Sequence, residues 1–208
     1  MYKNIIFDFD GTLVNTVGPI LLSLKQAFAE HDIFFDETIF NESLFVMPRS
    51  EVDKTYQRNV PKDKVDSVLK RYTELQPDKI KTGAFIYPGV ENMLKKLKES
   101  KKIFIATNSH RDRFQAKFNM LFKENLFDDF RAGVGTKSEM VADLIAMHEL
   151  DKLQTVMVGD GLGDIAAGHD SGIKTIACGY GYEKDKSALK NASDFYVESV
   201  SELSKFLA

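Results

Sequence analysis

The sequence predicts an α/β protein, in which a doubly wound parallel sheet lies between two layers of helices. Four short apolar runs recur along the chain, each too short for a helix and too continuous for a strand with one exposed face. Amphipathic stretches lie between most of these runs. Parallel strands covered by helices on both faces have this pattern. One long segment without such runs interrupts the alternation and predicts an inserted helical domain.

The four apolar runs are predicted to be parallel strands, and they occupy residues 4–7, 102–106, 155–158 and 174–177. After a polar first residue, nearly every position in them is apolar, as expected of strands that are buried on both faces. The clearest amphipathic stretches between them predict helices, at residues 90–99 and 138–149.

The segment of residues 16–82 contains only helix-like patterns, which occupy residues 19–30, 50–58 and 61–76. Pro61 and Asp63 begin the third pattern, as is typical of a helix N-terminus. Pro77 is expected to end it, because proline cannot donate the hydrogen bond that continues a helix. We therefore expect two domains, a core of residues 1–15 and 83–208 and a helical insertion of residues 16–82.

Composition and charge favour a soluble cytoplasmic protein that acts on a small molecule. Of the 208 residues, 43% are hydrophobic and 28% are charged, which suits a folded chain with a sizeable core. The formal charge of −3, without a basic cluster, argues against nucleic-acid binding. No apolar stretch approaches about 18 residues, so no membrane span is expected, and the N-terminus carries two carboxylates where a signal peptide needs an apolar segment. The single cysteine, Cys178, excludes an internal disulfide.

Acidic residues follow two of the predicted strands. Asp8 and Asp10 end the first strand and face the same side of it, and Gly11 permits a sharp turn and a close backbone approach. A pair of aspartates that only caps a turn is the alternative. Asp160 and Asp164 follow the third run, and the carboxyl ends of parallel strands share one edge of a sheet. Four acids there repel each other unless a cation lies among them, which predicts a Mg²⁺ site.

Three further residues favour an anionic ligand at this edge. Lys137 begins a predicted helix, where a cation opposes the helix dipole. A solvated surface lysine is the alternative, but the nearby acids favour a charge-balancing role. Thr107 and Asn108 end the second strand with a hydroxyl and an amide that could hold phosphate oxygens, and a helix-capping role is compatible with this.

In this order the motifs resemble the haloacid dehalogenase superfamily of phosphohydrolases, and they read Asp8-x-Asp10-Gly11-Thr12, Thr107-Asn108, Lys137 and Gly159-Asp160-(x)3-Asp164. The resemblance covers nearly the whole chain. It is greatest to the phosphoglycolate phosphatase and β-phosphoglucomutase branch, whose helical cap is inserted after the first strand. It implies a Rossmann-like three-layer core, a cap at residues 16–82, and a Mg²⁺-dependent phosphatase that acts on a small phosphorylated metabolite.

The resemblance implies a role for each acid. Asp8 would be the nucleophile that attacks phosphorus and forms an aspartyl phosphate. Asp10 would protonate the leaving oxygen and then activate water. Asp8, Asp160 and the backbone carbonyl of Asp10 would hold Mg²⁺, and Asp164 would orient Lys137 or metal-bound water.

The resemblance also implies phosphate ligands. Thr107, with Asn108 and the backbone amides around Gly11, would hold the transferring phosphoryl group. Lys137 would neutralise the nucleophile and the phosphate. Arg49, in the helical insertion, could meet a substrate carboxylate or a second phosphate, and a solvated helix start is the alternative for it.

Charge counting adds a hypothesis about Asp10. Four ionised aspartates carry minus four, whereas Lys137 and Mg²⁺ contribute plus three, so one carboxyl is expected to keep its proton, and Asp10 could be that one. Two positions depart from the family pattern. Asn15 stands where many members have a second aspartate, and Ser138 follows Lys137 where proline is usual.

Two other functions stay open at this point. A phosphosugar mutase would use the same aspartyl chemistry but shield the intermediate from water. A non-enzymatic phospho-acceptor or binding module would use a similar acidic pocket, although such modules lack an inserted helical domain. For the oligomeric state the sequence favours a monomer by default, with a dimer as the alternative.

Overall fold

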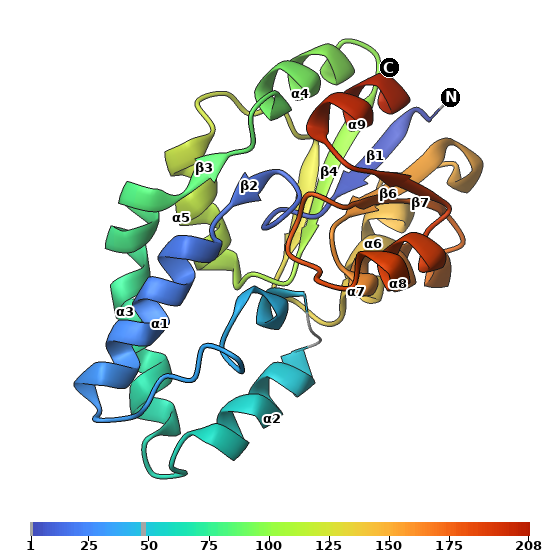
Figure 1. Ribbon diagram of the computed structural model, residues 1–208. Coiled ribbons are helices and arrows are strands. Elements are labelled where there is room, and N and C mark those ends of the chain that lie inside the picture. The colour runs from blue at the N-terminus through green and yellow to red at the C-terminus, as the bar shows by residue number, and fades with distance from the viewer. Residues whose placement is uncertain (1, 47–48) are drawn as a thin grey trace.

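The computed structural model describes residues 2–46 and 49–208, and its main feature is a parallel sheet of six strands (Figure 1). The strands, in chain order, are β1 (Asn4–Phe7), β4 (Lys102–Thr107), β5 (Asp129–Ala132), β6 (Thr155–Gly159), β7 (Lys174–Cys178) and β8 (Phe195–Val197). Their order across the sheet is β5-β4-β1-β6-β7-β8. All four predicted runs are strands. The other two, β5 and β8, are the edge strands. In β5, Asp129 and Arg131 interrupt the apolar pattern, and β8 is a run of only three residues.

The central strand β1 shows why the sheet is covered on both faces. It pairs in parallel with β4 and with β6. Ile5 and Phe7 are fully buried in one apolar cluster, whereas Ile6, which points the other way, is fully buried in a second. A strand with two buried faces is apolar at nearly every position, which explains the run of Ile5, Ile6 and Phe7 that predicted it.

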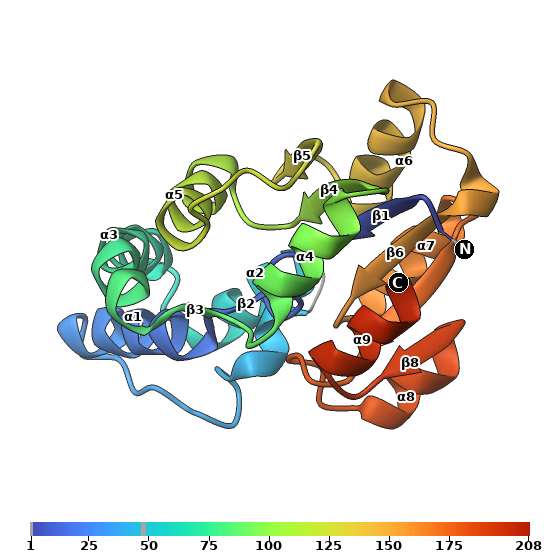
Figure 2. The ribbon, with the colours of Figure 1, turned by 90° about the horizontal axis from the view of Figure 1, so that it is seen from above.

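Helices supply the two outer layers (Figure 2). The cluster around Phe7 includes side chains of α4 (Val90–Lys98), α5 (Arg111–Leu121) and α9 (Val200–Leu207). The cluster around Ile6 includes α6 (Lys137–Met147) and α7 (Leu162–Asp170), and α8 (Lys186–Ala192) packs Leu189 against Ile165 and Ala177. A short 3₁₀ helix, η2 (Lys152–Gln154), precedes β6. Within residues 2–46 and 49–208, no helix combines the length and the apolar character that crossing a membrane requires.

A helical part lies between two short strands, β2 (Val14–Asn15) and β3 (Phe85–Ile86), which pair antiparallel. It contains α1 (Val17–Glu30), the 3₁₀ helix η1 (Glu42–Phe45), α2 (Arg49–Asn59) and α3 (Val65–Gly83). These elements have an apolar cluster of their own, in which the rings of Phe28 and Phe40 are 4.8 Å apart. The helical part lies beside one end of the sheet in Figure 1. The division into two domains at residues 16 and 82 stays a prediction.

The prediction that Pro77 ends the third helix of this part is wrong. Helix α3 continues through Pro77 to Gly83. The proline removes one backbone hydrogen bond and costs about 3 kcal/mol in a helix interior. However, Gln76 and Ile80, on either side of it, are buried, and Ala84 N donates to Ile80 O at 3.0 Å. Packing on both sides of the proline therefore holds the helix together.

Candidate active site

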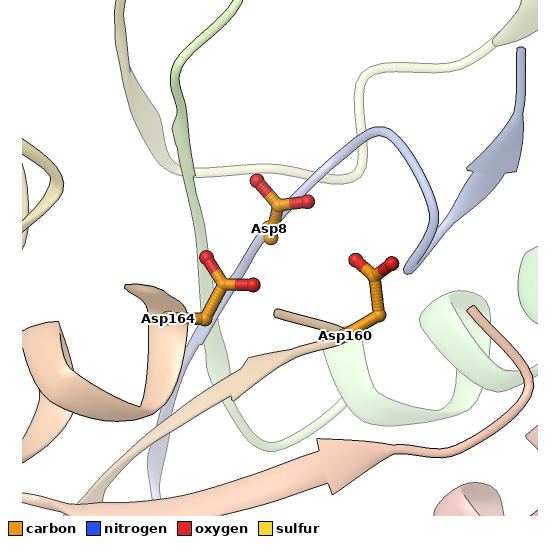
Figure 3. Close-up of side chains that lie close together, drawn as sticks. All are labelled: Asp8, Asp160 and Asp164. Carbon is orange, nitrogen blue, oxygen red and sulfur yellow. The ribbon is translucent and has the colours of Figure 1, made fainter. Parts of the chain in front are cut away.

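Three buried carboxylates meet at the carboxyl edge of the sheet (Figure 3). Asp8 follows β1 and Asp160 follows β6, and these strands are parallel neighbours, so their ends lie side by side. Asp164 lies in the first turn of α7, where its side chain accepts a hydrogen bond from Gly161 N at 3.0 Å. One oxygen from each carboxylate lies within 4.8 Å of the others. Such a set of oxygen atoms could hold a divalent cation.

Lys137 joins two of these carboxylates. It is the first residue of α6, which begins with a capping box in which Thr136 and Glu139 exchange hydrogen bonds. The buried ammonium contacts Asp8, lies 3.0 Å from Asp164 Oδ1, and donates to Ala106 O at 2.9 Å. Burial lowers the pKa of this lysine, but the carboxylates of Asp164 and Asp8 outweigh burial and raise it. The lysine is therefore charged.

One lysine does not balance three buried acids. Burial raises the pKa of Asp8 to about 7, Asp164 and Asp10 act in the same direction, and Lys137 opposes them. Burial, followed by repulsion from Asp8 and Asp164, raises the pKa of Asp160 well above its ordinary value. The cluster thus lacks positive charge, and a divalent cation would allow all three acids to ionise.

Asp10 lies in a different environment from that of Asp8. Both of its oxygens contact Lys117, Thr16 Oγ1 donates to Oδ1 at 2.7 Å, and Ser109 Oγ donates to Oδ2 at 2.7 Å. Burial favours the neutral acid, but Lys117, Thr16 and Ser109 outweigh burial and lower the pKa of Asp10. The hypothesis that Asp10 keeps the proton therefore differs from the structure, because the charge count behind it omitted Lys117.

The turn at Gly11 and Thr12 lies against the side chain of Asp160. Its φ is +92°, and its N–H donates to Val14 O at 2.8 Å, so this amide already has a partner. Thr12 Oγ1, next in the chain, donates to Asp160 Oδ1 at 3.0 Å. The turn after β1 is thus hydrogen-bonded to the carboxylate at the end of β6.

The remaining predicted ligands lie at different depths. Thr107 is buried at the end of β4, and its Oγ1 accepts a hydrogen bond from Ser109 N at 3.1 Å, whereas Asn108 is exposed. Arg49 begins α2, but its side chain lies outside the described residues. Asn15 is in β2 and its Oδ1 accepts from Val17 N at 3.3 Å. Ser138 Oγ donates to Asp170 at 2.7 Å, so the departure from proline adds a helix-to-helix contact.

Sequence reasoning missed two buried residues at this site. Lys117 lies in α5, and no motif marks it in the sequence. However, it stands between Phe114 and Phe118 on the apolar stripe of this helix, and a lysine in that position is a signal of a buried charge. Tyr182 follows β7: its backbone N donates to Asp160 Oδ2 at 2.7 Å, and its hydroxyl accepts from Thr16 N at 2.7 Å. No local pattern distinguishes this tyrosine from a core aromatic residue.

Residues 5–178 match the model of the family described as haloacid dehalogenase-like hydrolase. The chain belongs to the haloacid dehalogenase-like hydrolase family. A relative from Clostridium perfringens, named as a candidate pyrophosphatase, PpaX, is 31% identical over 98% of this chain and 96% of its own. A phosphoglycolate phosphatase from Psychrobacter arcticus is 28% identical over 86% of this chain and 84% of its own.

A solved structure gives the same fold. It is a haloacid dehalogenase-like family hydrolase from Streptococcus pneumoniae, with a TM-score of 0.88 and 20% sequence identity, over 100% of this chain and 99% of that chain. The comparisons confirm the predicted family and the predicted three-layer Rossmann-like fold. They also confirm the prediction that the chain is a phosphohydrolase.

Proposed function

We propose that the chain is a Mg²⁺-dependent phosphatase that hydrolyses a small phosphate monoester through an aspartyl phosphate on Asp8. The observation that carries this proposal is the buried group of Asp8, Asp160 and Asp164, whose oxygens lie within 4.8 Å of each other and of which Lys137 contacts two. An uncharged ligand would gain nothing from this arrangement. A divalent cation would balance the negative charge of the three carboxylates, and the cation and Lys137 together would bind a phosphate dianion.

The residues fit Mg²⁺. All donors are oxygens, the ligand type that Mg²⁺ prefers, and the raised pKa values of Asp8 and Asp160 indicate missing positive charge. We assign Asp8, Asp160 and the backbone carbonyl of Asp10 as the ligands, with Asp164 next to them. When bound, the ion would neutralise charge on the phosphate and on Asp8.

In the first step, one oxygen of Asp8 attacks phosphorus and the bond from phosphorus to the ester oxygen breaks. Asp10, whose lowered pKa leaves it ionised in the free chain, must first take up a proton, which it then gives to that leaving oxygen. In the second step Asp10 takes a proton from water, the water oxygen attacks phosphorus, and the bond to Asp8 breaks, which releases phosphate and regenerates the carboxylate. Lys137 and Thr107 would stabilise the charge on the phosphoryl oxygens, as transfer through a loose transition state requires.

The helical part would act as a cap that selects the substrate. Val46, just after η1, lies against the site, since a Cβ at Gly161 would stand 3.0 Å from Val46 Cβ. Lys184, after β7, forms an ion pair with Glu42 of η1 at 3.4 Å, although both side chains are about half exposed and the pair is weak. A part of the chain that covers the site in this way can exclude water and bulky substrates.

The experiment that tests the proposal is phosphate release from a panel of sugar phosphates, phosphoglycolate, nucleotides and pyrophosphate, with Mg²⁺ and with a chelator. The Asp8→Asn variant, which keeps the shape of the side chain, is measured beside the natural chain. We expect Mg²⁺-dependent release that the variant loses by at least about a thousandfold, since the variant lacks the nucleophile. Full activity in the variant, or in the presence of chelator, would overturn the proposal.

A further inference from the structure

Lys117 is a buried cation at the site whose contacts are complete. Its side chain is 4% exposed, and its ammonium contacts Asp10 Oδ1 at 2.6 Å, Asp10 Oδ2, and Ser109 Oγ at 2.9 Å. These contacts use the three donors of an ammonium group. The ammonium of Lys117 also lies 5.6 Å from the ring centroid of Phe9, the residue between Asp8 and Asp10 in the sequence.

The carboxylate of Asp10 also has a hydrogen-bond donor at each of its acceptor sites. A carboxylate has about four sites for hydrogen-bond donors. Lys117 occupies one on each oxygen, Thr16 occupies a second on Oδ1, and Ser109 a second on Oδ2. The position of this carboxylate is therefore determined by three side chains, of which Lys117 alone contacts both oxygens and carries a charge. One of these hydrogen bonds must break when Asp10 takes up the proton that it transfers.

Lys117 forms no contact with the cluster of Asp8, Asp160 and Asp164 among the contacts described above. Lys137 is the cation that contacts Asp8 and Asp164, whereas Lys117 contacts Asp10 and Ser109. The two lysines come from different helices, α6 and α5, on opposite faces of the sheet. Each therefore serves a different acid.

We propose that Lys117 is a positioning residue that, together with Ser109, holds the carboxyl group of Asp10 where it exchanges a proton with the leaving oxygen of the substrate. The inference rests on the proposed function. A lysine that only neutralised a buried charge would affect the hydrolysis of all phosphate esters alike. A lysine that positions the proton donor affects an ester more when its leaving oxygen needs the proton.

Two aryl phosphates of similar shape make this difference measurable. Phenolate is the anion of an acid with a pKa of about 10, like that of tyrosine, and its departure gains much from a proton. The p-nitrophenolate ion is a far weaker base and leaves without one. We expect Lys117→Met to lower kcat/KM for phenyl phosphate at least about tenfold more than kcat/KM for p-nitrophenyl phosphate, because the general-acid contribution is then lost for only one substrate. The ratio kcat/KM is compared because it reports the first step, whereas kcat also includes hydrolysis of the aspartyl phosphate, which both substrates share.

Lys101→Met is the matched control. Lys101 is also a buried lysine, but its ammonium donates to Tyr2 O at 2.9 Å and it precedes β4, at the opposite edge of the sheet. Its loss should leave the ratio of the two kcat/KM values unchanged. Equal losses on both substrates in Lys117→Met would overturn the positioning role.

Two other variants keep the inference testable if Lys117→Met does not fold. Ser109→Ala leaves the ion pair intact and removes a hydroxyl that binds both partners, so kcat/KM should fall in the same selective way by a smaller factor. In Asp10→Asn, adding Lys117→Met should change the ratio no further, and an additive loss would contradict the inference. Absence of turnover by the natural chain would instead contradict the proposed function, so the two failures are distinguishable.

Discussion

Gly11 and Asp160 approach each other so closely that no side chain fits between them: a Cβ at Gly11 would stand 2.6 Å from Asp160 Cγ. Gly11 also has a φ of +92°, which L-residues with a side chain rarely adopt. This approach brings the turn after β1 against the carboxylate that follows β6. It therefore helps to place Asp8 and Asp160 at one site.

Gly11→Ala should destabilise the protein and abolish turnover. The left-handed backbone alone costs about 1–2 kcal/mol for a residue with a Cβ, and the overlap with Asp160 adds to that cost or displaces the carboxylate. Urea denaturation measures the stability and phosphate release measures the activity.

Gly18→Ala is the control for this substitution. Gly18 lies in α1, and a Cβ there would meet no atom within 4 Å. Alanine favours a helix over glycine by up to about 1 kcal/mol, so this variant should be as stable as the natural chain or slightly more stable. If both variants had the same stability and activity, the close approach of Gly11 to Asp160 would have no importance.

Asp160→Asn should stabilise the metal-free protein and abolish its response to Mg²⁺. Asp160 is 1% exposed, and its pKa is raised by burial and by Asp8 and Asp164. An amide removes this repulsion and can still accept from Tyr182 N while it donates to the hydroxyl of Thr12. We therefore expect a higher free energy of unfolding near neutral pH, where the unfolded chain gains from ionising Asp160 and the folded chain does not.

Thermal unfolding with chelator and with Mg²⁺ measures both effects of this variant. The natural chain should gain stability from Mg²⁺, because a ligand that binds only the folded state stabilises it, whereas Asp160→Asn should not. A variant that is less stable than the natural chain in chelator would show that the three acids do not repel each other.

The central strands could be predicted from the sequence because burial on both faces leaves them mostly apolar after their polar first residue. The edge strand β5 could not, since Asp129 and Arg131 reach solvent or polar partners at the rim, and β8, with only three residues, is too short for a clear signal. Pro77 misled the prediction because tertiary packing along α3 outweighs the local cost of proline.

The site was partly predictable for a similar reason. Asp8 and Asp160 end strands whose order places them at one edge, so their meeting follows from the topology. Lys117, the partner of Asp10, and Tyr182, a partner of Asp160, do not follow from it, because they reach the site through helix and loop packing. The charge count in the sequence was incomplete for this reason, and with it the hypothesis that Asp10 is protonated.

The stability of the metal-free protein should fall as the pH rises from about 4 to about 7. The pKa of Asp8 is raised from 3.8 to about 7 in the folded chain, and that of Asp160 is raised as well. In this interval the unfolded chain has lost these protons and the folded chain still binds them. The folded state therefore binds more protons, so raising the pH favours unfolding.

Urea denaturation in chelator across this pH range measures the trend. The lowered pKa of Asp10 acts in the opposite sense, but only below the ordinary aspartate value of 3.8, outside the interval. Saturating Mg²⁺ should weaken or reverse the trend, because the ion binds the deprotonated acids. Metal-free stability that rises between pH 4 and pH 7 would contradict the raised pKa values.

Tyr182→Phe should separate the hydroxyl contacts of this tyrosine from its backbone contact. The hydroxyl accepts from Thr16 N at 2.7 Å and donates to Val14 O at 3.4 Å, whereas the backbone N donates to Asp160 Oδ2 at 2.7 Å. Phenylalanine removes only the hydroxyl contacts and leaves the buried N–H of Thr16 without that partner, at a cost of about 1–3 kcal/mol. Since the hydroxyl of Thr16 in turn donates to Asp10, we expect both stability and kcat to fall. The gain in melting temperature on adding Mg²⁺ should stay that of the natural chain, because Asp160 keeps its backbone donor. Loss of that gain would mean that Mg²⁺ binding at Asp8, Asp160 and Asp164 depends on the hydroxyl of Tyr182 and not on its backbone amide alone.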